Sequence, residues 1–141
     1  MKEYGRIVGI DVGTKRVGIA RTDLLRTIAN PYGTFEREEV FNKLEQLVRQ
    51  ENIKKFVVGW PLTPEGGEGD ATEMVDEFIE SLQQRFPDIE IVKIDERYTS
   101  KEAVELMIDA GVPKMKRREK ERIDKAAAAI ILQKYLDQEE Y

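Results

Sequence analysis

Two short β-type runs joined by four residues constrain the fold of this chain most. The runs are Ile7 to Val12 and Val17 to Thr22, and the residues between them read Gly-Thr-Lys-Arg. A glycine-containing connection between two such runs is typical of a β-hairpin, so we expect antiparallel pairing here. Ile28-Ala29 and Tyr32 to Phe35 could add a third antiparallel strand, which we expect Pro31 to interrupt.

The rest of the chain alternates helical stripes with apolar runs. In order, the expected elements are a helix within Glu38 to Glu51, a strand at Lys55 to Trp60, a loop at Pro61 to Gly69, a helix from Ala71 to Leu82, a strand at Ile89 to Glu96, a short helix from Ser100 or Thr99 to Ala110, and a last helix through Ile123 to Leu136. This order predicts an α/β fold with a mixed five-stranded sheet, in which three antiparallel strands precede parallel ones and helices cover both faces. We expect residues 1–141 to form a single domain.

The absence of two residue types narrows the possible chemistry. The chain contains no His and no Cys, which excludes Ser-His-Asp triads, Cys nucleophiles and the usual zinc sites. Carboxylates without imidazole favour hard cations such as Mg²⁺ or Mn²⁺. The net charge of −5 argues against a protein that coats nucleic acid through bulk charge, but it leaves room for a local basic face.

Nothing in the sequence indicates secretion or a membrane. The beginning of the chain does not resemble a secretion signal, and the longest uninterrupted apolar run, Ala126 to Leu132, is too short to span a bilayer. The lack of cysteine is typical of a reducing compartment. We therefore expect a cytoplasmic protein without a membrane partner.

Asp11 interrupts the first β-type run and is the most unusual residue of the sequence. Strand alternation places it on one face together with Ile7 and Gly9. Burying an unpaired carboxylate is costly, so we expect Asp11 to be neutralised, hydrogen-bonded or facing a cleft that holds a cation. We interpret Gly9 and Gly13 as room for a ligand to approach the backbone. The alternative is that Asp11 caps the hairpin turn.

Two further places supply acids that could meet Asp11. Asp95 and Glu96 end the last strand, and alternation sends them to opposite faces, so only one of them shares a face with Asp11. Asp124 lies near the start of the last helix, and the small residues Ala126 to Ala129 would let that helix lie close to the sheet. Taken singly, the acids also fit a solvated strand end and a helix terminus. Converging carboxylates would suit one or two divalent metals that activate a water for attack on a phosphodiester.

Basic residues could complete such a site by holding a phosphate backbone. Lys15, Arg16 and Arg97 are candidates, and so is the stretch KMKRREKER from Lys114 to Arg122. This stretch contains Lys116, Arg117 and Arg118. The alternative is a solvated, salt-bridged start of a helix, because two glutamates dilute the charge of the stretch.

Four blocks, GIDVGTKRVGIA, VVGWPLTPEGGEG, DERYTS and IDKAAAAIILQKYL, occur in this order along nearly the whole chain. In these blocks the sequence resembles the YqgF family, also called RuvX, whose members are labelled pre-16S rRNA nucleases or Holliday junction resolvases. The resemblance implies the RNase H-like fold of the RuvC resolvases. It also implies metal-dependent cleavage of a structured nucleic acid that leaves a 5′-phosphate, with ribosomal RNA precursor as the favoured substrate.

By position, the resemblance assigns Asp11, Glu96 and Asp124 as the catalytic acids and metal ligands. RuvC-type enzymes carry the second acid on the strand after the first helix, whereas that strand here ends Gly59-Trp60-Pro61-Leu62 without an acid. The second carboxylate would come from the neighbouring strand, which leaves Asp95 as a candidate and the number of metals open. The resemblance leaves open whether RNA or branched DNA is cut, and whether the protein is a homodimer. Trp60 could stack on a base or belong to the core.

Two other functions fit parts of the sequence. Asp11-Val12-Gly13-Thr14 also resembles the opening motif of the actin, Hsp70 and sugar-kinase folds, where it grips nucleotide phosphates. Those proteins need two such domains around the nucleotide, and 141 residues supply one. A non-catalytic nucleic-acid or ribosome-associated module would keep the fold and bind without cutting.

Overall fold

A mixed five-stranded sheet forms the centre of the protein. The computed structural model describes residues 5–26, 28–61, 69–95 and 117–139, with the side chains of all of these except 70, 117–125 and 139. The strands are β1 (Arg6–Val12), β2 (Arg16–Thr22), β3 (Ala29–Glu36), β4 (Ile53–Trp60) and β5 (Glu90–Asp95), in the sheet order β3-β2-β1-β4-β5. β1–β2 and β2–β3 are antiparallel, whereas β1–β4 and β4–β5 are parallel. The predicted sheet is therefore confirmed.

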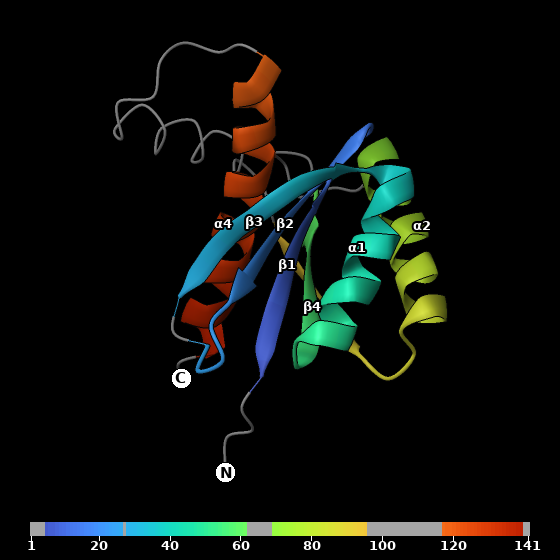
Figure 1. Cartoon of the computed structure of the whole chain (residues 1–141). Coiled ribbons are helices and arrows are strands. Elements are labelled where there is room, and N and C mark those ends of the chain that lie inside the picture. Colours follow the sequence, from blue (N-terminus) through green and yellow to red (C-terminus); the bar gives the residue numbers. More distant parts are fainter. Residues whose placement is uncertain (1–4, 27, 62–68, 96–116, 140–141) are drawn as a thin grey trace.

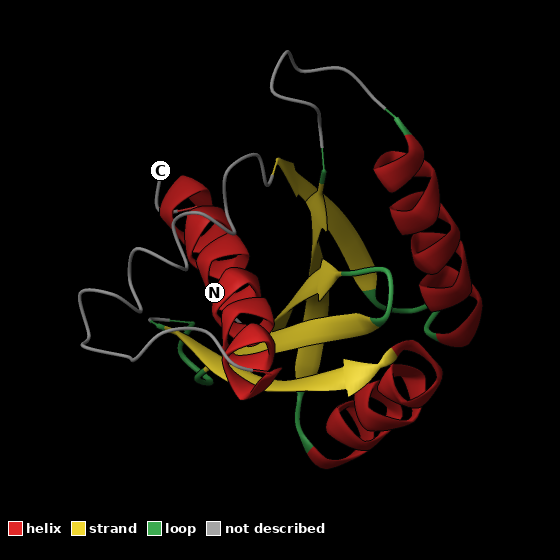
Figure 2. Ribbon diagram, turned by 90° about the horizontal axis from the view of Figure 1, so that it is seen from above, coloured by secondary structure: helices red, strands yellow, loops and turns green. Residues whose placement is uncertain are grey.

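Helices cover both faces of the sheet, as expected. α1 (Arg37–Gln50) and α2 (Asp70–Arg85) lie on one face, and α4 (Arg117–Glu139) crosses the other (Figures 1 and 2). The helix expected between Ser100 and Ala110 falls outside the described residues. None of the helices described is long and apolar enough to cross a bilayer.

The third strand differs from its prediction. We expected Pro31 to interrupt it, but β3 runs unbroken from Ala29 to Glu36, so that expectation is wrong. β3 lies at the edge of the sheet, where a missing N–H can face outward without loss of a ladder bond. The pairing also shifts register, with Ile19 opposite Gly33 and Ala20 opposite Pro31, so that Tyr32 is the extra residue of a bulge.

The central strands are buried on both faces. On the α1 and α2 face, Val8, Ile10 and Val58 belong to the larger apolar cluster. On the α4 face, Ile7 and Val57 pack in a second cluster with residues of α4. Burial on both sides explains why β4 reads as a continuous apolar run rather than an alternating one.

Lys55 of β4 anchors the end of α4 to the sheet. Its ammonium donates a hydrogen bond to the Tyr135 hydroxyl, and its Nζ lies 2.9 Å from a Glu90 carboxylate oxygen. Burial acts to lower the pKa of Lys55, but the hydrogen bonds to Tyr135 and Glu90 outweigh it, so the pKa is raised. Lys55 therefore stays protonated and holds α4, β4 and β5 together at the end of the sheet far from Asp11.

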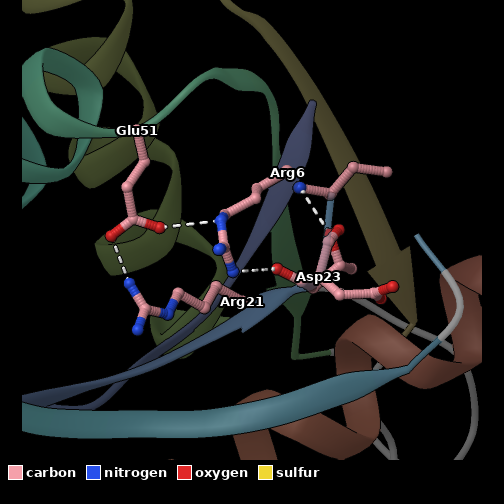
Figure 3. Close-up of polar contacts among 6 residues, drawn as sticks. Arg6, Arg21, Asp23 and Glu51 are labelled. Carbon is pink, nitrogen blue, oxygen red and sulfur yellow. Dashed lines mark hydrogen bonds and ion pairs between the residues drawn. The ribbon is translucent and has the colours of Figure 1, made fainter. Parts of the chain in front are cut away.

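A half-buried charge cluster fixes the end of α1 to two strands (Figure 3). Glu51, the C-cap residue of α1, lies 2.9 Å from Nε of Arg6 in β1 and also pairs with Arg21 in β2. Arg6 donates a further bond of 3.0 Å to the carbonyl of Thr22. One carboxylate thus neutralises part of two guanidinium charges and ties three elements together.

Candidate active site

Asp11 lies near the C-terminal end of β1, and its neighbours in the two adjacent strands are glycines. It is half-buried on the face that α4 covers. Its partner in β2 is Gly18, and on the β4 side Val58 pairs with Ile10, so that Gly59 follows as the neighbour of Asp11. Both strands that flank β1 therefore place a glycine beside Asp11.

The glycines flanking Asp11 in the sequence do not serve the purpose we expected. A Cβ on Gly9 would lie 2.7 Å from Cβ of Leu132 and 2.9 Å from the carbonyl oxygen of Ala128, so α4 occupies that space. A Cβ on Gly13 would lie 2.6 Å from the carbonyl oxygen of Arg16, which accepts the Gly13 N–H at 2.9 Å. The interpretation of these two glycines as room for a ligand is therefore wrong. One lets a helix approach and the other closes the hairpin.

The direction of α4 follows from its contacts with the sheet. Lys55, the partner of Ile7, reaches Tyr135, and Gly9 meets Ala128 and Leu132. α4 therefore runs antiparallel to β1. The part of α4 that precedes Ala128 therefore extends towards the end of the sheet that carries Asp11.

The structure describes one of the two acids at the end of β5, Asp95. Asp95 pairs with Trp60 of β4, whereas Ile94 packs in the cluster under α4. Since successive side chains alternate, Asp95 lies on the α2 face, opposite to Asp11. Glu96 falls outside the described residues. Asp95 could meet Asp11 only across the thickness of the sheet, which argues against it as a shared ligand.

The predicted basic residues are described only in part. Lys15 is exposed in the β1–β2 turn, and Arg16 is the half-buried first residue of β2, so both lie at the end of the sheet that carries Asp11. Arg97 and Lys116 fall outside the described residues. Arg117 and Arg118 form the start of α4, and their side chains are among those left out.

The chemistry of the predicted acids can be tested against a metal only through Asp11. Among the described residues, no group of three or more carboxylates is gathered, and the side chains of Glu96 and Asp124 are not among those described. Asp11 itself fits the requirement for an oxygen donor, since it is a half-buried carboxylate whose cross-strand partner in β2 is Gly18. Oxygen donors of this kind suit Mg²⁺ or Mn²⁺.

Trp60 lies on the face away from Asp11. Its ring packs at the edge of the larger core cluster, and Nζ of Lys93 sits 3.9 Å from the ring centroid. The side chain also lines an open cavity of about 260 Å³. The other residues around this cavity are Gly69, Thr72, Glu73 and Asp76. Trp60 is therefore a residue at the edge of the core, and its ring makes a cation–π contact with Lys93. It does not lie beside Asp11.

Comparisons with known proteins agree on one family. The family profile described as "RuvX: Holliday junction resolvase" matches residues 5–138. A Salinibacter ruber protein named "Putative pre-16S rRNA nuclease" is 47% identical over 137 residues, covering 97% of this chain and 96% of that protein. A Chlorobium luteolum protein of the same name is 41% identical, covering 98% of each chain.

A solved structure supports the fold. The T. thermophilus RuvC in complex with Holliday junction substrate superimposes with a TM-score of 0.52 at 15% identity, covering 96% of both chains. At this identity the likeness concerns the fold alone, and it confirms the RNase H-like architecture that the resemblance implied. The profile match over nearly the whole chain and the close curated relatives together settle the assignment: the chain belongs to the RuvX family.

Proposed function

We propose that this RuvX-family protein is a metal-dependent nuclease that hydrolyses phosphodiesters in structured nucleic acid. The observation that carries the proposal is the setting of Asp11, a half-buried carboxylate on the α4 face of β1 whose neighbours in β2 and β4 are glycines. A structural acid would not need neighbours without side chains in both adjacent strands. Curated relatives named as pre-16S rRNA nucleases make ribosomal RNA precursor the favoured substrate.

Asp11, Glu96 and Asp124 would hold the metal. They come from β1, from the residue after β5 and from α4, so three elements distant in sequence would each contribute one carboxylate. Bound Mg²⁺ or Mn²⁺ would supply an activated water and neutralise charge on the phosphoryl oxygens. We favour Glu96 over Asp95 as the second acid because Asp95 lies on the α2 face.

Basic residues around the acids would position the substrate. Lys15 and Arg16 lie on the turn that follows Asp11, and their charges would contact backbone phosphates on either side of the scissile bond. Arg97, Lys116, Arg117 and Arg118 are proposed to extend this contact. Phosphate contacts position a strand without reading its sequence, so structure rather than sequence would select the cleavage site.

A second candidate substrate is a four-way DNA junction. The family profile is described as a Holliday junction resolvase, and the fold is that of a RuvC bound to a junction. A junction has two symmetric strands to cut, so this function would favour a homodimer. A cleavage panel of ribosomal RNA precursor, single-stranded RNA and a four-way DNA junction separates the two candidates.

The test uses two acids on opposite faces of the sheet, Asp11 and Asp95, as a matched pair. Asp11→Asn should lower cleavage by at least about a hundredfold in Mg²⁺ or Mn²⁺, since metal ligation supplies several kcal/mol of transition-state stabilisation. Asp95→Asn removes a carboxylate from the other face and should keep near wild-type activity. Chelation with EDTA should stop cleavage by the wild type. Equal activity of Asp11→Asn and wild type would refute the proposal, and binding without cleavage by every protein would favour a binding module.

A further inference from the structure

Four side chains from β2, β3 and α1 form a row on the α1 face of the sheet, with two aromatic rings in the middle and a cation at each end. The Arg21 guanidinium carbon lies 4.6 Å from the centroid of the Tyr32 ring. The Tyr32 and Phe35 rings are 6.0 Å apart at a tilt of 41°, and Nζ of Lys43 lies 5.7 Å from the Phe35 centroid. We call Arg21, Tyr32, Phe35 and Lys43 the β3 row. Phe35 also packs at the edge of the larger core cluster, but Tyr32 belongs to neither core cluster nor to the predicted site.

The local sequence builds the row at an open edge of the sheet. A Cβ on Gly33 would lie 2.9 Å from Cζ of Phe35, so the Phe35 ring lies over the backbone of its own strand. This posture is available only because residue 33 carries no side chain. β3 is an edge strand, and the Tyr32 side chain is 37% exposed there. The Tyr32 ring can therefore be reached from solvent, whereas Phe35 is partly buried against the larger core cluster.

We propose that the β3 row binds the bases of an unpaired RNA strand that continues from the substrate at Asp11. Aromatic faces accept stacked bases of any sequence, and Lys43 adds a positive charge at the Phe35 end of the row. This inference rests on the proposed nuclease function for the identity of the strand. It adds a second contact surface on the face of the sheet away from the acids.

The register of the sheet gives the strand a continuous path. Thr34 of β3 pairs with Gly18, which in turn pairs with Asp11, so the Phe35 end of the row lies at the Asp11 end of the sheet. The β1–β2 turn with Lys15 lies at that same end, between the two faces. From there the row leads along β3 towards Arg21, which is opposite Asn30. A strand leaving the acids could follow this turn onto the row.

The charges around the row favour unpaired bases over a duplex. Arg21 shares its charge with Glu51, and Glu36, Glu38 and Glu39 are exposed at the start of α1. These acidic groups make the surface a poor general binding site for phosphates. Stacking of bases on the rings would therefore have to supply most of the affinity for RNA. A duplex hides its base faces and offers only phosphates, so it should not use this row.

The experiment measures binding of a fluorescein-labelled, unstructured 12-nucleotide RNA by anisotropy, with EDTA present so that no strand is cut. Tyr32→Leu should weaken binding about fivefold or more, because one stacking surface is lost. Tyr32→Phe keeps the ring and should stay within about twofold of wild type. Leu25→Ala removes an apolar side chain that is 59% exposed outside the row, and it should not change the affinity. Single-stranded DNA should follow the same order of variants, since its bases have the same faces.

The same variants distinguish the other occupants. A duplex RNA of the same sequence should bind wild type and Tyr32→Leu alike. Unchanged binding of the single strand by a folded Tyr32→Leu protein would overturn the inference. The inference would also be overturned if wild type were a dimer in sedimentation velocity and Tyr32→Leu were a monomer that binds RNA normally. The row would then be an interface between two copies of the chain. Retained cleavage by Asp11→Asn would sink the proposed function while leaving a Tyr32 effect on binding intact.

Discussion

At Gly9 a single hydrogen atom decides how closely α4 can approach the sheet. Gly9→Ala would bring its new Cβ to 2.7 Å from Leu132 and 2.9 Å from the Ala128 carbonyl, and a backbone atom cannot move without moving the helix. We expect a loss of about 1–3 kcal/mol in the free energy of unfolding, measured by urea denaturation. Gly33→Ala is the control, because its new Cβ meets only the tip of the Phe35 ring at 2.9 Å, and that ring can turn. Equal losses in the two variants would contradict this account.

Single residues also mark the limit of what the sequence could predict. Asp11 was recognisable because an acid in a strand that is otherwise apolar needs a reason. The purpose of Gly9 was not recognisable, since a sequence does not say whether a ligand or a helix covers a given face. For Asp95 and Glu96, strand alternation showed that only one of them shares a face with Asp11, but it did not show which one. The pairing of Asp95 with Trp60 in β4 shows that Asp95 lies on the face opposite to Asp11.

Among the elements, the end of α1 depends on one carboxylate. Glu51 pairs with Arg6 and Arg21, and the exposed fractions of these three side chains are 19%, 27% and 31%. Glu51→Gln should lower the free energy of unfolding by about 1–2 kcal/mol, because two partly buried guanidinium groups lose their counter-ion.

Glu45 offers a matched control on the same helix. It also contacts two arginines, Arg49 at 4.0 Å and Arg85 at 3.3 Å, but these side chains are 79% and 46% exposed. Glu45→Gln should therefore change the free energy of unfolding by less than about 0.5 kcal/mol. The comparison is made by urea denaturation at low and moderate salt. A larger loss in Glu45→Gln than in Glu51→Gln would show that burial does not set the value of these ion pairs.

The elements themselves were largely predictable. The order of strands and helices followed from two patterns in the sequence. A helix that buries one face shows an apolar stripe, and a strand that buries both faces shows a continuous apolar run. β3 was the exception, since Pro31 is disfavoured inside a sheet but tolerated at an edge. Edge position is a property of the assembled sheet, so no local signal could have reported it. The bulge at Tyr32, which helps to build the β3 row, was invisible for the same reason.

For the whole molecule, topology explains how distant carboxylates could gather. Parallel strands β1 and β4 bring Asp11 beside Gly59, and α4 returns antiparallel across the same face. The order of elements predicted this arrangement through the handedness of crossovers. Which loop residues complete the site could not be predicted in the same way, because loops lack the periodic patterns that fix strands and helices.

If the carboxylates do meet, the folded protein should bind a metal that the unfolded chain cannot. A ligand at 100 times its Kd stabilises the folded state by about 2.7 kcal/mol, which for a domain of this size corresponds to a rise in Tm of about 8 °C. We expect Mn²⁺ to raise the Tm of wild type and of Asp95→Asn by amounts of this order, measured by differential scanning calorimetry against K⁺ at equal ionic strength. Asp11→Asn should show little or no rise. A rise in Tm of equal size in all three proteins would mean that the metal binds elsewhere, and the convergence of Asp11 with Glu96 and Asp124 would then have to be abandoned.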